Sequence, residues 1–491
     1  MLRIESTYRT SGLSALLVAL LLSLLVPASA VASPSPDWAA LPDEVRVSIF
    51  GHASLDDVQV TPRAESIQLI ADGRAMEIPV NVTVFMSRAN ERIEIHFGSE
   101  SLSAREVTLK GSPSGAFDVR IRSGSDTRTY TGSLEVSVEH DDLRLVNLVP
   151  IEDYVASVVG SEYGLDDEEG TKAMAIVART YALFALQQNR DLHDSERSQV
   201  YQGLQKANAR ARAAARATAG QVLTHDGRLI EAVYSASNGG RTASNESAWG
   251  SSELPYFRSR KDPWDARVSP HASWTWEVSE KDLEQAASRA FGMDVRNIRI
   301  RETAKDGRVV EVRLEGRGTD KTISGSSFRA AMARTFGAMT LKSAYFDMSS
   351  KRNRYVFKGH GFGHGVGMSQ WGAHGMARAG HGYQEILDFY YRGTDIETMP
   401  GAEAIPATIA SGGSQDDALT AETVWGQKTD KTAEPTSRDD EMTGEEAVST
   451  ETTEAKKEVA NKEAAGKDEK KDAEEAEEEE SKSKPKKRRG W

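Results

Sequence analysis

Glu162 stands where an acid could transfer a proton. In residues 151–164 the apolar side chains recur at helical spacing and form one stripe, and Glu162 occupies its next position; the stripe consists of Ile151, Tyr154, Val155, Val158 and Val159. Such a stripe faces a protein interior or a cleft, so burial should disfavour the carboxylate and raise its pKa. A general acid that works near neutral pH requires a raised pKa. The alternative is a helix-terminal glutamate in a structural ion pair.

Lys172 and Arg179 are two basic residues that could act with this acid. They are seven positions apart in a predicted helix over residues 171–188, so they share one face of it. If they face Glu162, they favour its ionised form and oppose the effect of burial. They could instead bind hydroxyl or carboxylate groups of a substrate, or belong to an ordinary solvated helix face.

The segment 359–377 is unusually rich in glycine and histidine. Glycine fills every second position from 359 to 367, which indicates unusual backbone conformations or close packing. His360 and His364 are four residues apart, but the segment has no HExxH motif and no nearby carboxylate or cysteine to complete a metal site. We therefore expect no metal, and favour a loop that lines a substrate groove with His364, Ser369 and Gln370 as hydrogen-bonding groups.

Small polar and aromatic residues gather in segments 234–250 and 254–265. Rings that pack on sugar faces, together with amides that meet hydroxyl groups, would suit a sugar-binding groove. The same composition fits a surface loop with Trp249 and Trp264 in the core. From the residues alone we favour the surface loop.

The elements that must position these residues differ in period along the chain. Alternating apolar and polar residues predict strands before residue 148, at 45–50, 78–86, 92–97 and 117–124. Helical spacing then predicts helices at 151–164, at 171–188 with Thr171 as the N-cap, at 206–220 and at 383–393. The expected fold class is therefore α+β.

Both ends of the chain differ from the body between them. Two arginines, an apolar stretch over residues 13–26 and a small-residue site ending at Ala30 predict a signal peptide over residues 1–30, with an uncleaved membrane anchor as the alternative. Residues 401–491 carry 24 acidic and 15 basic residues and few apolar ones, so we expect a disordered acidic tail with a basic end.

The composition excludes several functions. The formal net charge is −13, and the body before the tail is nearly neutral, so nothing indicates a nucleic-acid binder. The chain has no cysteine, which excludes disulfides, thiolate zinc sites, cysteine nucleophiles and a lipidated cysteine anchor. An exported protein that folds without disulfides is expected.

Taken together, the segments resemble the SpoIID/LytB family, also called stage II sporulation protein D and amidase-enhancer proteins. The resemblance covers about residues 146–395 and is carried by the blocks VNLVPIEDYVASVVGSEYG, TKAMAIVARTYAL, SQVYQG, YSASNGGRTASNESAWG, DPWD and GHGFGHGVGMSQWGAHGMARAGHGYQEILDFYYRGT. It implies a SpoIID-like domain with a substrate groove at 146–397, preceded by a β-rich region at 41–145.

The resemblance implies a lytic transglycosylase that cuts peptidoglycan between N-acetylmuramic acid and N-acetylglucosamine. Glu162 occupies the family's acid position, and the sugar's own hydroxyl would attack, so that one carboxyl group suffices and an anhydro-muramic end forms. No cofactor is implied. By the same resemblance, the substrate groove would include Lys172, Arg179, Gln199, Tyr201, His364, Ser369 and Gln370.

Two departures from the family pattern and one alternative function accompany this interpretation. Tyr234-Ser235-Ala236 stands where relatives often have Tyr-His-Ser, so the zinc site of some relatives should be absent, and Tyr163 follows the acid where Met is more usual. The alternative is a non-catalytic glycan-binding enhancer of a cell-wall amidase. The expected partners are glycan strands and such an amidase, with a membrane only through an uncleaved leader.

Overall fold

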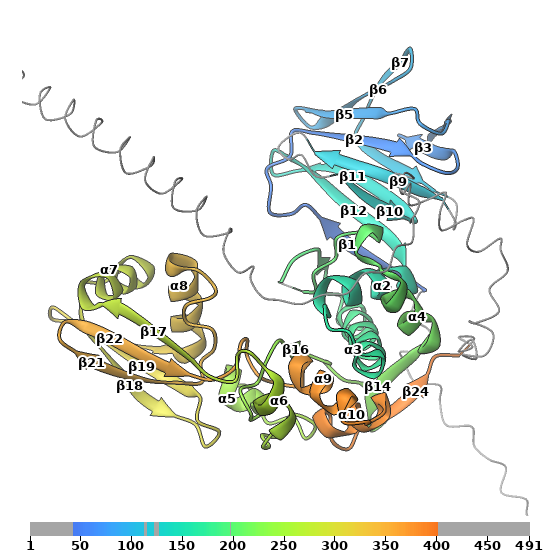
Figure 1. Cartoon of the computed structure of the whole chain (residues 1–491). Coiled ribbons are helices and arrows are strands. Elements are labelled where there is room, and N and C mark those ends of the chain that lie inside the picture. The colour runs from blue at the N-terminus through green and yellow to red at the C-terminus, as the bar shows by residue number, and fades with distance from the viewer. Residues whose placement is uncertain (1–42, 112–114, 122–126, 197, 401–491) are drawn as a thin grey trace, which may run out of the picture. The chain divides into compact units, whose positions relative to one another are not determined.

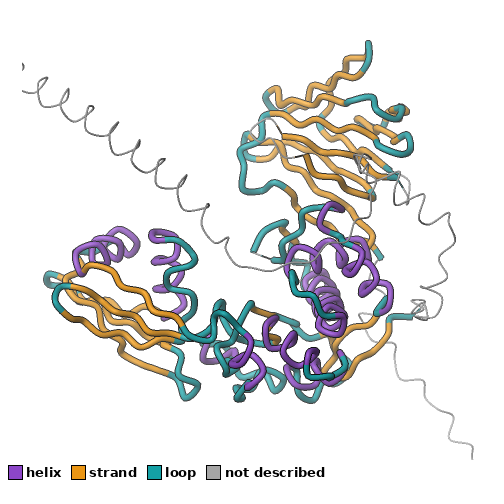
Figure 2. Tube along the Cα trace, viewed as in Figure 1, coloured by secondary structure: helices purple, strands orange, loops and turns teal. Residues whose placement is uncertain are grey.

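The structure is a computed structural model, which describes residues 43–111, 115–121, 127–196 and 198–400 (Figure 1). The predicted signal peptide over residues 1–30 and the predicted tail over 401–491 lie outside these residues. The described chain contains both a long run of strands and many helices, which confirms the α+β class (Figure 2). Among the described residues, none of the helices has the length and apolar character needed to cross a bilayer.

Twelve strands come first and, with the later β13, form two sheets. The strand order is β13-β1-β12-β11-β8-β3-β4 in one sheet and β10-β9-β2-β5-β6-β7 in the other. Buried and solvent-facing side chains alternate along β1, β2 and β6, as expected for strands with one face on a core. The bounds are β1 Glu44–Ile49, β2 Asp57–Pro62, β3 Ile67–Ala71, β4 Arg74–Ile78, β5 Val84–Ala89, β6 Arg92–Phe97, β7 Glu100–Ala104, β8 Glu106–Lys110, β9 Ala116–Ile121, β10 Thr127–Thr131, β11 Ser133–Glu139, β12 Asp142–Pro150 and β13 Leu192–His193.

One of the four predicted strands is wrong. The run 78–86 was expected to be continuous, but β4 ends at Ile78 and β5 begins at Val84. Pro79 follows Ile78 directly and has no N–H to donate to a ladder. Asn81 has a φ of 63°, in the left-handed region, so the chain turns between the two strands.

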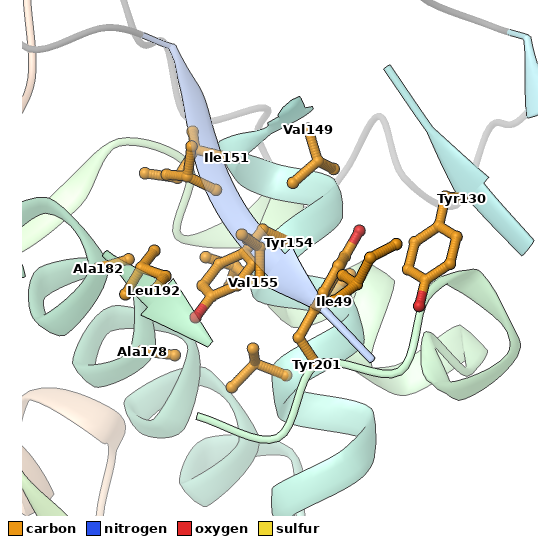
Figure 3. Packing of buried hydrophobic residues seen from close by; sticks show 14 of the residues in the cluster. Ile49, Tyr130, Val149, Ile151, Tyr154, Val155, Ala178, Ala182, Leu192 and Tyr201 are labelled. Carbon is orange, nitrogen blue, oxygen red and sulfur yellow. The ribbon is translucent and has the colours of Figure 1, made fainter. Parts of the chain in front are cut away.

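Four helices and a small sheet follow and pack on one another. They are α2 Ile151–Glu162, α3 Glu168–Gln187, the short 3-10 helix η2 Leu204–Lys206, α4 Ala209–Ala217 and the strands β14 Gln221–His225, β15 Arg228–Leu229 and β24 Asp395–Thr398. Figure 3 shows Tyr154 and Val155 of α2 among Ala178 and Ala182 of α3, Leu192 and Ile49. The same cluster of buried residues includes side chains of the two N-terminal sheets, so α2 packs on a core that is shared with these sheets.

The N-cap of helix α3 lies four residues before the predicted position. Thr171 was expected to be its N-cap, but Asp167 is the N-cap, and its carboxylate accepts a hydrogen bond of 2.6 Å from the N–H of Gly170. Asp is among the strongest N-cap residues, and Glu168 and Glu169 add favourable charge to the first turn. Thr171 is therefore buried inside the first turn.

Residues 274–359 form a part of the chain with a core of its own. Helices α7 and α8 lie over one face of strands from the sheets β17-β22-β21 and β18-β19-β20 (Figure 1). Leu283, Leu314, Phe328 and Phe357 are among its buried residues. The bounds are β17 Trp274–Ser279, α7 Glu280–Phe291, β18 Val295–Thr303, β19 Val309–Gly316, β20 Asp320–Ser324, α8 Gly325–Phe336, β21 Phe346–Lys351 and β22 Arg354–Gly359.

Short elements join this part to the helices around α3. They are β16 Tyr234–Ser235, α5 Asn245–Trp249, α6 Pro263–Val268, β23 Met368–Ser369, α9 Gln370–Arg378 and α10 Tyr383–Tyr390. Strands β16 and β23 pair in parallel, with Tyr234 opposite Met368 and Ser235 opposite Ser369. Two segments more than 130 residues apart in the sequence are thereby placed side by side.

Candidate functional site

Glu162 is the last residue of α2, and its side chain is half-buried. The predicted apolar stripe of α2 is buried, with Tyr154, Val155, Val158 and Val159 each fully covered. Glu162 continues that stripe at the point where the helix ends. Its carboxyl group therefore lies at the boundary between the core and the solvent.

Hydrogen bonds from three distant segments fix Glu162. The N–H of Val200 donates to its Oε1 at 2.8 Å, and the hydroxyl of Tyr234 is hydrogen-bonded to its side chain. The amide of Gln370, the first residue of α9, donates to its backbone carbonyl at 3.1 Å. Burial raises the pKa of Glu162, while the hydrogen bonds from Val200 and Tyr234 act in the opposite direction. The exposed Glu196 adds a smaller contribution that raises the pKa further.

A chain of hydrogen bonds leads from the core to this carboxyl group. The hydroxyl of Tyr154 donates to Oε1 of Gln199 at 3.0 Å, and Nε2 of Gln199 donates to the hydroxyl oxygen of Tyr234 at 3.3 Å. Because Tyr234 accepts from Gln199, its own proton is free to be donated to Glu162. Gln199 is fully buried, so it orients Tyr234 and does not offer its amide to a substrate.

The glycine-rich segment holds Tyr234 in place through close backbone contact. Gly367 has a φ of 67°, and a Cβ there would lie 2.0 Å from the carbonyl oxygen of Val233. Gly363 has a φ of 106°, and a Cβ there would lie 2.8 Å from the Cβ of Ser235. Any other residue at these two positions would push the segment and β16 apart, and so displace Tyr234 of β16.

His364 of the same segment lies against the backbone of Tyr234. Its ring is hydrogen-bonded to that backbone, and its Nδ1 accepts a hydrogen bond of 3.1 Å from the N–H of Val366. Burial lowers the pKa of His364 to about 4, so the ring is neutral at neutral pH. Since Nδ1 is an acceptor, the proton is on Nε2. This histidine positions its neighbours and is a poor proton donor for chemistry near pH 7.

Trp249, at the end of α5, contacts the His364 ring. The two ring centroids are 5.2 Å apart, and 46% of the Trp249 residue surface is exposed. The expectation that Trp249 belongs to the core is therefore wrong, because α5 ends at the surface with Gly250 as its left-handed cap. Trp264 is half-buried against the main core.

Arg179 has a structural environment and does not face Glu162. Its side chain has no exposed surface, and its Nη2 lies 2.5 Å from Oε2 of Glu152 at the start of α2. It also donates to the carbonyl oxygens of Ala215 and Gln221 at 3.2 and 3.1 Å. These contacts tie α2, α3, α4 and β14 together. They give no support to the prediction that Arg179 binds substrate.

Lys172 also pairs within its own helix. Its Nζ lies 2.7 Å from Glu168 and 2.9 Å from Glu169, and both carboxylates are in the first turn of α3. The side chain remains partly exposed, so its place in the substrate groove stays a prediction. Lys172 and Arg179 were expected to lower the pKa of Glu162 if they faced it. The groups that shift this pKa are instead Val200, Tyr234 and Glu196, together with burial.

Tyr201 and Ser369 are buried and hold the scaffold of the site. The hydroxyl of Tyr201 donates to Oδ1 of Asn147 at 2.7 Å, and its ring lies 5.2 Å from that of Tyr154. Ser369 is the N-cap of α9 and donates to the buried carboxylate of Asp265 at 2.6 Å. That hydrogen bond sets the start of α9, and thereby the position of Gln370.

The histidines of the glycine-rich region have separate partners. His360 lies 2.8 Å from the carbonyl oxygen of Ala272, His374 lies 2.7 Å from Asp167, and His381 lies 3.2 Å from Glu385. Within the described ranges, no three His, Asp or Glu side chains lie close enough together to hold a metal ion.

The structure brings together Glu162, Gln199, His364 and Gln370 of the predicted residues. Tyr201 and Ser369 belong to the buried scaffold around them, and Arg179 pairs with Glu152. The substrate-binding role of Lys172 stays a prediction. Sequence reasoning missed Tyr234, although this residue belongs to a segment that was singled out for its composition. Its alignment with Glu162 depends on β16 pairing with β23. A strand of two residues is too short to show an alternating pattern, so nothing in the sequence indicates this pairing. Only the residue type, a tyrosine with a hydroxyl to donate, could have indicated that Tyr234 bonds to Glu162.

Comparisons with known proteins match the part of the chain that builds this site. The family model for SpoIID, stage II sporulation protein, matches residues 139–225, which run from the end of β11 to the end of β14 and include Glu162. A model for a domain of unknown function, DUF8618, matches residues 265–367. This second match covers the part of the chain with its own core.

Three curated relatives extend the match. An uncharacterized protein of Brachyspira hyodysenteriae is 33% identical over 54% of this chain and 72% of its own length. The amidase enhancer of Bacillus subtilis is 30% identical over 46% of this chain, which corresponds to 38% of that longer protein. Stage II sporulation protein D of Bacillus amyloliquefaciens is 29% identical over 57% of this chain and 84% of its own length. The resemblance seen in the motifs is thereby confirmed, and the chain belongs to the SpoIID/LytB family.

Proposed function

We propose that this protein is an exported lytic transglycosylase that cleaves peptidoglycan glycan strands between N-acetylmuramic acid and N-acetylglucosamine. Glu162 first donates its proton to the glycosidic oxygen, and the bond from the muramic carbon to that oxygen breaks. The resulting carboxylate then takes the proton of the muramic sugar's own hydroxyl, whose oxygen bonds to the same carbon. An anhydro-muramic end forms, and no water is consumed.

The environment of Glu162 is the observation that carries this proposal. A general acid must be protonated before the reaction, and burial at the end of α2 favours the protonated form. A general base must then accept a proton, and the donors Val200 and Tyr234 stabilise the carboxylate that the first step produces. The same carboxyl group is therefore supported in both of its roles.

Glu196 distinguishes a lyase from a hydrolase at this site. Hydrolases that invert or retain configuration use two carboxyl groups on either side of the scissile bond. Glu196 is the carboxylate, among the described residues, whose charge acts on Glu162. Under the proposal Glu196→Gln retains activity, because the substrate supplies its own nucleophile. Loss of activity in that variant, with products that lack the anhydro ring, would indicate a hydrolase.

A regulatory role is the second candidate, because one relative is named an amidase enhancer. In that case the site would hold glycan or an amidase without cutting the strand. The role of Glu162 separates the two functions, since a binding protein does not need its proton.

The test is to digest purified glycan strands with the wild-type protein and with Glu162→Gln, and to analyse the ends by mass spectrometry. Anhydro-muramic ends that appear with the wild type and are absent with the variant support the lyase. If neither protein cuts and both bind glycan, the enhancer takes its place. Export by the predicted signal peptide is part of the proposal, and is tested by the N-terminal sequence of the mature protein.

A further inference from the structure

Val200, whose backbone N–H donates to Glu162, lies between two buried residues. Gln199 on one side has no exposed surface, and only 2% of Tyr201 on the other side is exposed. Gln199 is hydrogen-bonded to Tyr154 of α2. The position of the Val200 N–H is therefore set by the groups that hold its two neighbours.

Tyr201 is held by Asn147, a fully buried residue of β12 in the N-terminal sheets. The hydroxyl of Tyr201 donates to Oδ1 of Asn147 at 2.7 Å. Nδ2 of Asn147 in turn donates to the carbonyl oxygens of Thr131 and Ser133, at 3.0 and 2.9 Å. The Tyr201 ring lies beside that of Tyr130, with the ring centroids 5.6 Å apart (Figure 3). The hydroxyl of Tyr201 thus meets an acceptor whose position is fixed by the strands around it.

Gly203 brings the same segment into close contact with β10. It has a φ of 75°, and a Cβ there would lie 2.3 Å from the carbonyl oxygen of Thr129, so only glycine fits. Its own carbonyl oxygen accepts a hydrogen bond of 2.7 Å from the hydroxyl of Ser157 in α2. The segment is enclosed between β10 and the helix that ends at Glu162.

An ion pair holds the chain on the other side of Val200. The carboxylate of Asp194 lies 2.8 Å from Nη1 of Arg128 in β10, and it accepts a hydrogen bond of 2.8 Å from the N–H of Phe50. Only 3% of the Asp194 side chain is exposed. Strand β13, directly before Asp194, pairs in parallel with β1. The N-terminal sheets therefore hold the chain both before and after the residue that donates to the acid.

We propose that the N-terminal sheets are part of the candidate site, because they hold the Val200 N–H on the Glu162 carboxyl group. The proposal rests on the function proposed above for Glu162. It assigns a role at the acid to β1 and β10, which lie outside the residues matched by the family model. Two contacts carry this role, Tyr201 on Asn147 and Asp194 on Arg128.

The buried ion pair makes the position of the chain depend on Arg128. Without Arg128, Asp194 keeps the single N–H of Phe50 as its donor, which is too little for a buried carboxylate. We expect the chain to move until water reaches Asp194. The hydrogen bond from Val200 to the acid then weakens.

Any effect of these contacts on Glu162 has to pass through Val200. Among the described residues, the groups that shift the pKa of Glu162 are Val200, Tyr234 and Glu196, together with burial. The charge of Arg128 is not one of them. A weaker hydrogen bond from Val200 stabilises the carboxylate less, so the pKa of Glu162 should rise when either contact is removed.

The experiment titrates Glu162 by carbon-13 NMR of the full chain, labelled at the carboxyl carbon of the glutamate side chains. The signal that disappears in Glu162→Gln belongs to Glu162, and its midpoint is followed against pH. Tyr201→Phe and Arg128→Met should each raise the midpoint by about half a pH unit or more, because complete loss of a hydrogen bond to a charged group shifts a pKa by about one to two units. Arg46→Met should leave the midpoint in place, since its ion pair with Glu135 is exposed on the same sheets.

A double variant separates displacement of the chain from a general loss of stability. Arg128→Met combined with Asp194→Asn should reverse most of the midpoint shift, because an amide needs no counter-charge and its oxygen still accepts from the N–H of Phe50. Tyr201→Phe keeps its ring beside Tyr130, so the core stays filled. Thermal unfolding of each variant checks that the fold is intact.

Other outcomes overturn the inference. If the midpoint stays in place or falls in both Tyr201→Phe and Arg128→Met, the sheets do not position the donor. If Arg46→Met raises it equally, the sheets have loosened as a whole. Because the titration involves no cleavage, a midpoint that rises as expected in a protein that produces no anhydro-muramic ends would refute the lyase and leave the positioning of Val200 in place.

Discussion

Replacing Tyr234 with phenylalanine should raise the pKa of Glu162 and extend activity to higher pH. The hydroxyl of Tyr234 is hydrogen-bonded to the Glu162 carboxyl group and favours its ionised form. Removing the hydroxyl leaves burial, which favours the protonated form, with only the Val200 N–H acting against it. The protonated acid required for the first step then persists to higher pH.

The size of the effect follows from the strength of the lost hydrogen bond. A hydrogen bond to a charged group contributes about 1.5–3 kcal/mol, and about 1.4 kcal/mol corresponds to one pH unit of pKa. The neutral carboxyl group also bonds to the hydroxyl and offsets part of this difference. The alkaline limb of the pH profile should therefore move upward by about one pH unit. Below that limb the rate should fall, because Tyr234 no longer positions the carboxyl group.

The assay records the initial rate of anhydro-muramic end formation against pH, at substrate concentrations far below KM, for the wild type and Tyr234→Phe. Tyr355→Phe is the matched control, because it removes a tyrosine hydroxyl that accepts from the N–H of Ile298 in the separate core. An alkaline limb that stays in place, or moves to lower pH, would refute the assignment of Tyr234 as a donor to Glu162.

Three further predictions concern the acid, its support and its surroundings. Glu162→Gln should be more stable than the wild type in urea at pH 7 but not at pH 4. The pKa of Glu162 is higher in the folded than in the unfolded protein, so the stability of the wild type falls as the pH rises from the unfolded-state pKa through the folded-state pKa. Glutamine does not titrate, so the variant is free of this loss. Arg179→Ala should lower the free energy of unfolding by about 3–5 kcal/mol, because Glu152 loses its buried partner, whereas the exposed Arg378→Ala should cost little by the same urea titration. Trp249→Ala should weaken binding of glycan oligomers about tenfold by calorimetry, and the equally exposed Phe85→Ala should not.

The sequence predicted the position of Glu162 at the end of a buried stripe because that signal is local. The period of α2 places Glu162 on the buried stripe, and twelve residues of helix are enough to show it. The same reasoning failed for the environment of Arg179. Its helical position suggested a side chain that faces Glu162, a substrate or solvent, but the side chain is completely buried. A charged residue is buried only when a partner compensates it, and Glu152 lies 27 residues away in the sequence.

The contacts that complete the site could not be predicted in this way. Val200, Tyr234 and Gln370 reach Glu162 from 38, 72 and 208 residues along the chain. Each of these contacts depends on how strands pair or on where a helix begins. Neither is visible in the spacing of apolar residues along a single sequence.

The glycines between positions 359 and 367 explain how one acid can be both desolvated and well supported. Gly363 and Gly367 let the segment approach β16 closely, and Tyr234 of β16 is hydrogen-bonded to the partly buried Glu162. Burial alone would raise the pKa of the carboxyl group and leave its ionised form without donors. The donors alone would lower the pKa and leave no proton to give. Because close backbone packing supplies both effects at once, a side chain at Gly367 should impair the acid step and the base step together.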